Sequence, residues 1–190
     1  MKEITAGMLL YHGSYCVVEE PNLDKCAKYK DFGQGFYLTS SKRQARSFAK
    51  IATTKAKNDG IIPANTDCGY ISCFKVNDIS DISCYYFPFA DVDWLHCIVA
   101  HRRKRVFVDL RKQLEDYDVI VGKIANDDTN TTINAYMSHV FGKMGSPVAD
   151  KMCIGLLIPE RLQDQVCFRS AKALSLSKLS FQYRESIVLG

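Results

Sequence analysis

The chain has 190 residues, of which 47% are hydrophobic and 24% are charged, and its formal net charge is +4 at pH 7. This length suffices for one well-buried core and is short for two independent domains, so a single domain spanning residues 1–190 is expected. No apolar run approaches the roughly 20 residues of a membrane-spanning helix, and residues 1–7 lack the apolar segment of a secretory signal, which together predict a cytoplasmic protein without membrane contact.

The cysteines argue against both disulfides and metal centres. Eight are present at irregular spacings, several fall in apolar strand-like segments, and none forms a Cys-x-x-Cys pair. In a cytoplasmic chain we expect such residues to be reduced and mostly buried as small hydrophobic side chains. Because the His and Cys spacing typical of zinc ligands is also missing, no metal site is predicted.

Short strands and amphipathic helices follow one another without regular βαβ alternation. In chain order, we expect a strand at 8–11, a loop or short helix at 21–30, a strand at 35–39, a helix at 41–57, a strand at 69–76, helices at 91–104 and 108–114, a strand at 119–121, helices at 132–141 and 148–157, and strands at 165–169 and 178–183. The clearest helical signal is the apolar stripe of Ala45, Phe48, Ala49, Ala52 and Ala56. Ser40 or Ser41 can cap this helix, and Pro159 is expected to stop the helix at 148–157. The mixture predicts an α+β fold.

Two short segments stand out as candidates for ligand binding. The first is His12-Gly13-Ser14, which follows a short apolar strand, so that His12 can point into a cleft while the Gly13 backbone approaches a ligand closely. The second runs from Asp31 to Thr39 and contains Gly33 and Gly35 before an aromatic strand that carries Tyr37. Together they predict the walls of one pocket for a nucleotide.

These residues resemble the ADP-ribosyltransferase superfamily, in the branch that includes the poly(ADP-ribose) polymerases and diphtheria toxin. That branch has a His-Gly strand end, a Gly-x-Gly-x-Tyr strand, a helix that starts near Ser-Lys and a strand opened by Glu. The first three match His12-Gly13, residues 33–37 and Ser41-Lys42 in order and spacing. A small, poorly characterised bacterial family with this fold is similar too, because it has Pro-[Asn/Asp]-Leu, here at 21–23, and Ala-Asn-Asp-Asp, here at 125–128. The resemblance implies an ADP-ribosyltransferase-like split β-sheet core with flanking helices, and NAD as the substrate.

The resemblance also implies roles for the matched residues. His12 would bond a ribose hydroxyl of the adenosine half of NAD, the backbone of Gly13 would pair with the nicotinamide carboxamide, and Tyr37 would stack on the nicotinamide ring. Ser14 completes the first motif. The alternatives are a histidine satisfied at a strand end and an aromatic side chain on a core strand.

Two residues of the expected helix at 41–57 join this candidate NAD site. Ser41 would bond the carboxamide, cap the helix, or do both. Phe48 is the candidate for a second aromatic wall, although packing of its side chain in the core is an equal alternative.

The fourth motif departs from the family pattern, because Gln165 stands where the family has Glu. A glutamine can bond the ribose 2′-hydroxyl, but it brings no charge to stabilise a cationic transition state and cannot act as a base. This argues against polymer elongation and favours transfer of a single ADP-ribose. The missing carboxylate is expected from Asp164, or from Asp127 and Asp128, whose alternative role is a helix N-cap or turn.

The leading hypothesis is therefore an NAD-dependent mono-ADP-ribosyltransferase that modifies a protein or nucleic-acid acceptor. The resemblance further implies a bacterial toxin or defence effector paired with an antitoxin protein. The alternatives are an NAD glycohydrolase and a non-catalytic module that binds NAD or ADP-ribose. The basic run from His101 to Arg105 is either a solvated helix end or a contact for the NAD pyrophosphate or for an acidic target such as nucleic acid.

Overall fold

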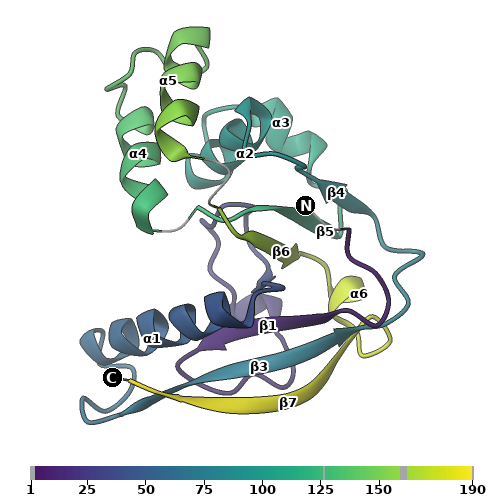
Figure 1. Cartoon of the computed structure of the whole chain (residues 1–190). Coiled ribbons are helices and arrows are strands. Elements are labelled where there is room, and N and C mark those ends of the chain that lie inside the picture. The colour runs from purple at the N-terminus through teal and green to yellow at the C-terminus, as the bar shows by residue number, and fades with distance from the viewer. Residues whose placement is uncertain (1–2, 126, 159–161, 190) are drawn as a thin grey trace.

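The computed structural model describes residues 3–125, 127–158 and 162–189. Its elements, in chain order, are β1 (Leu9–Ser14), the 3-10 turn η1 (Leu23–Lys25), β2 (Phe36–Leu38), α1 (Lys42–Asn58), β3 (Cys68–Val76), β4 (Cys84–Tyr86), α2 (Val92–Arg102), α3 (Val108–Gln113), β5 (Val119–Lys123), α4 (Asp127–Met137), α5 (Pro147–Leu157), β6 (Asp164–Phe168), α6 (Ala171–Leu174) and β7 (Leu179–Val188). The α+β class expected from the sequence is confirmed. The strands form two sheets (Figure 1).

The first sheet has three antiparallel strands in the order β1-β3-β7, and α1 lies along it (Figure 1). The helix begins at the predicted place, where the Ser41 hydroxyl accepts a hydrogen bond from the backbone N–H of Gln44. Its buried side consists of small residues, namely Ala45, Ala49, Thr53 and Ala56. Because these side chains are short, the helix axis can lie close to the strands.

The second sheet has four strands in the order β2-β6-β5-β4, of which β4 and β5 run parallel and the other pairs antiparallel. Helices α2 to α5 gather on the side of the molecule away from the three-stranded sheet (Figure 1). The largest buried side chains of this helical layer include Trp94, Leu95, Ile98 and Tyr136, which pack with Ile120 of β5 in one cluster. The Trp94 indole N–H donates to the Lys123 carbonyl at 2.9 Å, which ties α2 to the end of β5.

A second hydrophobic cluster joins the two sheets. It contains Leu10, Phe36, Leu38, Phe74, Val166 and Phe168. At one edge the sheets also meet through the backbone, because Tyr11 of β1 and Thr39 exchange two hydrogen bonds of 2.8 and 3.0 Å. The three-stranded sheet therefore continues into the four-stranded sheet at a single residue pair.

Several elements differ from the sequence-based expectations. Strand β1 continues to Ser14, because β3 continues opposite it as far as Tyr70. Helix α4 starts at Asp127, earlier than expected, and ends at Met137. Strand β4 was not expected, and β7 is longer than the predicted strand at 178–183. Pro159, expected to stop α5, lies outside the described residues.

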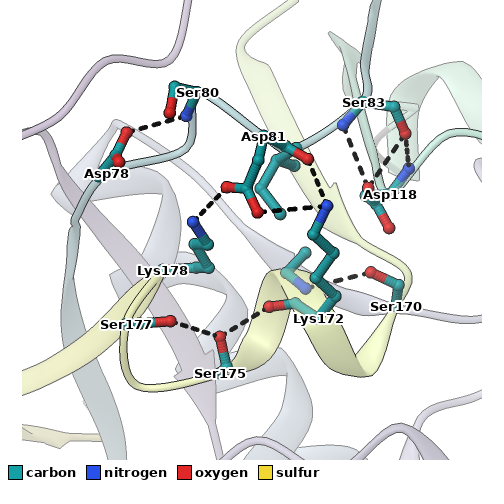
Figure 2. A network of polar contacts seen from close by, with 12 residues as sticks. Asp78, Ser80, Asp81, Ser83, Asp118, Ser170, Lys172, Ser175, Ser177 and Lys178 are labelled. Carbon is teal, nitrogen blue, oxygen red and sulfur yellow. Dashed lines mark hydrogen bonds and ion pairs between the residues drawn. The ribbon is translucent and has the colours of Figure 1, made fainter.

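A polar network fastens the short helix α6 to the loop before β4 (Figure 2). The Asp81 carboxylate pairs with Lys172 and Lys178, and the Ser170 hydroxyl caps α6 by accepting from the Ala173 N–H. Beside it, the Asp118 carboxylate accepts from both the N–H and the hydroxyl of Ser83, at 3.1 Å each. The network connects the C-terminal strands to the middle of the chain. Within the described ranges, no helix is both long and apolar enough to cross a membrane.

Candidate functional site

Three sequence motifs that are far apart in the chain lie on three adjacent strands. His12 and Gly13 belong to β1, Tyr37 belongs to β2, and Gln165 belongs to β6. Strand β1 contacts β2 through the Tyr11–Thr39 bridge, and β2 pairs with β6 so that Tyr37 lies opposite Cys167. The fold therefore brings the predicted site residues into one region.

His12 holds β1 and β2 apart just beyond the Tyr11–Thr39 bridge. In a regular antiparallel ladder the next bonded pair after this bridge would be Gly13 and Tyr37. Instead, the Tyr37 carbonyl accepts a hydrogen bond of 2.8 Å from Nδ1 of His12. The imidazole thus takes the acceptor that a ladder bond from Gly13 would have used, and the strands separate. We call this gap the β1–β2 split.

Gly13 lines the β1–β2 split with unpaired backbone groups. Because Tyr11 bonds to Thr39, the N–H and C=O of Tyr11 point away from β3, and those of Gly13, two residues later, point the same way. Gly13 lies opposite Ile71 of β3 in the same non-hydrogen-bonded register as Tyr11 opposite Cys73, and its backbone makes no recorded bond to a loop or turn of the described residues. The split therefore presents one donor and one acceptor side by side.

The face of Gly13 that lacks a side chain packs against α1. A Cβ atom at this position would lie 2.0 Å from the Ala45 carbonyl oxygen and 2.7 Å from the Ala49 backbone nitrogen. Only glycine permits β1 and α1 to lie this close. The glycine thus has a packing role besides the proposed ligand contact.

The His12 imidazole is neutral in this arrangement, and its Nε2 atom is unprotonated. Since a carbonyl can only accept, Nδ1 carries the proton and Nε2 has a lone pair, to which no described residue bonds. Burial lowers the pKa of His12 below its usual value, and the hydrogen bond to Tyr37 opposes this effect. The ring also lies against Phe36, with 4.5 Å between ring centroids. His12 is therefore a neutral hydrogen-bonding group whose Nε2 is free for a ligand.

Tyr37 is placed differently from the prediction. Successive strand residues point to opposite faces, so its ring leaves β2 on the face opposite to Phe36 and packs toward the helical layer. Its hydroxyl donates to the Gly33 carbonyl at 2.8 Å and accepts from the Phe32 N–H at 2.9 Å. The resemblance predicted that the Tyr37 ring would stack on the nicotinamide ring. Here the ring packs against the core of the helical layer and its hydroxyl is bonded to its own loop, as expected for the alternative of an aromatic side chain on a core strand. His12 and Tyr37 meet instead through the Tyr37 backbone.

Gln165 is buried and held by a carboxylate that the sequence analysis did not single out. Its Nε2 donates to Oδ2 of Asp31 at 3.1 Å and to the Lys123 carbonyl at 3.2 Å. Because both partners are acceptors, the amide nitrogen must face them, and Oε1 is left without a partner among the described residues. Gln165 shares its face of the sheet with Tyr37, because Tyr37 is opposite Cys167 and side chains alternate along β6.

Asp31 itself forms an ion pair with Arg102, whose Nη2 lies 2.6 Å from Oδ1. Arg102 also donates to Asn130 of α4 at 2.7 Å. The contacts of Asp31 thus connect the loop before β2 with Arg102 at the end of α2 and with Gln165 of β6. Nothing in the sequence pattern indicates this grouping, since its members come from three distant segments.

The remaining predicted residues lie near this region or elsewhere. Ser41 caps α1, as one of its two alternatives predicted. Phe48 is half-buried on α1, one turn from Ala45, and belongs to none of the three hydrophobic clusters. Ser14 ends β1, with its hydroxyl 3.9 Å from the Cys16 sulfur.

The carboxylates considered for the missing charge have other positions. Asp164 pairs with Lys123 at 2.8 Å. Asp127 and Asp128 lie in the first turn of α4, and their side chains are outside what the structure describes. The carboxylate in contact with Gln165 is Asp31.

The basic run at the end of α2 is not one solvated face. His101 is buried, Arg102 pairs with Asp31, and the Lys104 ammonium lies 5.1 Å from the centroid of the Tyr29 ring. Only Arg103 and Arg105 are exposed without an ion pair or ring contact among the described residues. The description as a solvated helix end therefore fits Arg103 and Arg105 within this run, and the contact with a pyrophosphate or an acidic target stays a prediction.

Comparison with known proteins gives one family match. The profile of the family described as "Protein of unknown function (DUF3990)" matches residues 8–181. This range contains every residue of the β1–β2 split and of the Asp31–Gln165 contact. No curated protein matches the chain.

Proposed function

Because the chain belongs to the DUF3990 family, whose function is unknown, we infer its activity from the site and propose that it is an NAD-dependent mono-ADP-ribosyltransferase acting on a cellular macromolecule. The observation that carries this proposal is the β1–β2 split, in which His12 Nε2 and the backbone of Gly13 stand unpaired beside each other. The motif order of the sequence, with its resemblance to ADP-ribosyltransferases, supports the same activity.

The split suits the nicotinamide end of NAD. A carboxamide has one acceptor oxygen and one donor nitrogen, which match the N–H and C=O of Gly13 as a pair of parallel hydrogen bonds. A neutral His12 offers an acceptor at Nε2 for a ribose hydroxyl. Phe48, half-buried in the turn of α1 that abuts Gly13, is the aromatic side chain available to cover the pyridine ring.

The reaction breaks the bond between ribose C1′ and the nicotinamide nitrogen, and forms a bond from C1′ to a nucleophile of the acceptor, which gives up its proton. Positive charge develops at the ribose as nicotinamide leaves, so acceptor groups beside the sugar lower the barrier. We assign this role to Oε1 of Gln165, which Asp31 holds in place on the same short strand pair that borders the split. Gln165 lies on the face of β2 and β6 opposite to Phe36 and the His12 ring, and strands are about 5 Å apart, so one substrate can reach both groups where it passes through the split.

Nicotinamide release from NAD tests the proposal. The native protein is incubated with NAD and cell lysate, and both released nicotinamide and label transferred to macromolecules are measured. His12→Ala should reduce both by about tenfold or more, because a hydrogen bond to the ligand is lost. His139→Asn is the matched control, since His139 is exposed at the end of α4 and asparagine tolerates its left-handed backbone.

The outcomes separate the related activities. Labelled macromolecules establish transfer, and free ADP-ribose without labelled macromolecules establishes NAD hydrolysis. If the native protein neither binds NAD nor releases nicotinamide, the proposal is refuted. If macromolecules are labelled, separating protein from nucleic acid identifies the class of the acceptor. Because the resemblance includes bacterial toxins, an antitoxin protein that binds this chain is then the partner to look for.

A second candidate is a non-catalytic module that binds NAD or ADP-ribose. The observation that favours it is Gln165, which brings no charge, together with the pairing of Asp31 to Arg102, which neutralises the nearest carboxylate. Calorimetric binding of NAD without nicotinamide release would select this candidate.

A further inference from the structure

A cavity of about 360 Å³ is lined by none of the residues of the β1–β2 split or of the Asp31–Gln165 contact. It is bordered by the loop at residues 28–34, by the end of α2, by the segment from α3 to β5 and by the residues after β6. Arg169 directly follows Phe168, which pairs with Phe36 at the start of β2. Gln165 lies next to Val166, which pairs with Leu38 at the end of β2. Arg169 is four positions after Gln165, which corresponds to about 13 Å along an extended strand.

Two residues that line the cavity each have a buried nitrogen atom without a hydrogen-bond partner within the described part of the chain. The two atoms are Nε2 of His101, which lies against Gly33, and Nε of Arg169. His101 is only 7% exposed, and its Nδ1 donates to the Cys97 carbonyl at 2.9 Å, which orients Nε2 away from its own helix. Arg169 is oriented by donating from Nη1 to the Leu114 carbonyl. A buried polar group without a partner destabilises the fold, and a ligand that bonded to it would remove this cost.

The inner part of the cavity is cationic. Arg111 and Arg169 are half-buried there, and Lys28 and Lys104 stand at the exposed rim. The opposing inner carboxylate is that of Asp118, which already accepts two hydrogen bonds from Ser83 (Figure 2). Glu115 and Asp116 are exposed at the rim, where water screens their charge.

We propose that this cavity binds the phosphoryl group of a small ligand, with Arg169 Nε and the Arg111 guanidinium as donors and His101 Nε2 as the partner of the protonated phosphate oxygen. Arginine matches the geometry of phosphate oxygens, and a phosphoryl group that keeps one proton offers an acceptor to Arg169 Nε and a donor to His101 Nε2. The volume exceeds that of one phosphate and leaves room for a small organic group beside Tyr29 and Tyr117. The proposal does not require the NAD-dependent activity, although His101 and Lys104 belong to the basic run for which a contact with the NAD pyrophosphate is one alternative.

Calorimetric titration of the full chain at constant ionic strength tests this site. Inorganic phosphate and phenyl phosphate serve as probes. We expect saturable binding in the native protein and affinities weakened by about tenfold or more in both Arg169→Gln and Arg111→Gln, because each removes a charged donor. Arg103→Gln is the matched control, since Arg103 is exposed and outside the cavity, and it should bind like the native chain.

The two probes identify the source of the phosphoryl group. Tighter binding of phenyl phosphate indicates a phosphorylated organic ligand, and equal or weaker binding indicates free phosphate. Arg111→Gln keeps the test valid if Arg169→Gln fails to fold, because the Arg169 contact to Leu114 remains. The absence of saturable binding by either probe, or equal binding in Arg111→Gln and the Arg103→Gln control, overturns the proposal.

Discussion

Replacing Gly13 by alanine tests the close approach of β1 to α1. The new Cβ would stand 2.0 Å from the Ala45 carbonyl oxygen and 2.7 Å from the Ala49 nitrogen. Non-bonded heavy atoms need about 3.5 Å, so the helix or the strand must move by about 1.5 Å. Both obstructing atoms belong to the backbone and cannot rotate away as a side chain would. Overpacking typically costs about 1–3 kcal/mol, and this geometry places Gly13→Ala at the upper end, about 3 kcal/mol.

Urea unfolding followed by far-ultraviolet circular dichroism measures this cost. Gly155→Ala in α5 is the control, because a Cβ there meets nothing within 4 Å. Alanine is the better helix former, so this variant should gain about 0.5–1 kcal/mol. If Gly13→Ala unfolds within about 0.5 kcal/mol of the native protein, β1 and α1 do not pack as described. The expected result would also mean that lost activity in Gly13→Ala reports on folding as well as on ligand binding.

Three further predictions concern the polar contacts around the split. Tyr37→Phe removes the two hydrogen bonds that hold the loop before β2, and urea unfolding should show a loss of about 1–3 kcal/mol; an unchanged midpoint would contradict the bonding described. Asp31→Asn leaves Arg102 without its ion-pair partner, with only 15% and 11% of the two side chains exposed, so thermal unfolding should register a loss of about 2–3 kcal/mol; a neutral result would mean the pair is solvated. Burial lowers the pKa of both His12 and His101, so the unfolded chain takes up protons first as the pH falls below about 6.5, and stability should decline by up to about 1.4 kcal/mol per pH unit for each. A stability that is flat from pH 7 to 5.5, or a slope unchanged in His101→Gln, would disprove this assignment.

The hydrophobic spacing of the sequence predicted the long elements well. The stripe of α1 is visible in the sequence because apolar residues recur at helical spacing on one face, and Ala45, Ala49 and Ala56 of this stripe are buried, together with Thr53. Strand β4 escaped prediction because three residues, Cys84 to Tyr86, are too few for an alternating pattern. The extension of β1 through His12 and Gly13 depends on its pairing with β3, which polar residues do not reveal.

The site was only partly predictable. The sequence motifs predicted that His12, Gly13, Tyr37 and Gln165 form one region, and the strand pairing does bring them together. The direction of the Tyr37 hydroxyl depends on the loop before it. The role of Asp31 depends on contacts with α2 and β6, and no local pattern marks a carboxylate whose partners lie so far along the chain.

The strand pairing also determines when the protein can fold during its synthesis. Strand β2 finds its partner only when β6 has left the ribosome, and the three-stranded sheet is finished only by β7. Pairings between distant segments form slowly and leave apolar strands exposed meanwhile. The nascent chain thus has to remain unaggregated through most of translation. Strands β1 and β2, which border the split, are synthesised before β6 and β7, the strands that complete their sheets. The chain can therefore bind a ligand in the split only after these last strands have paired.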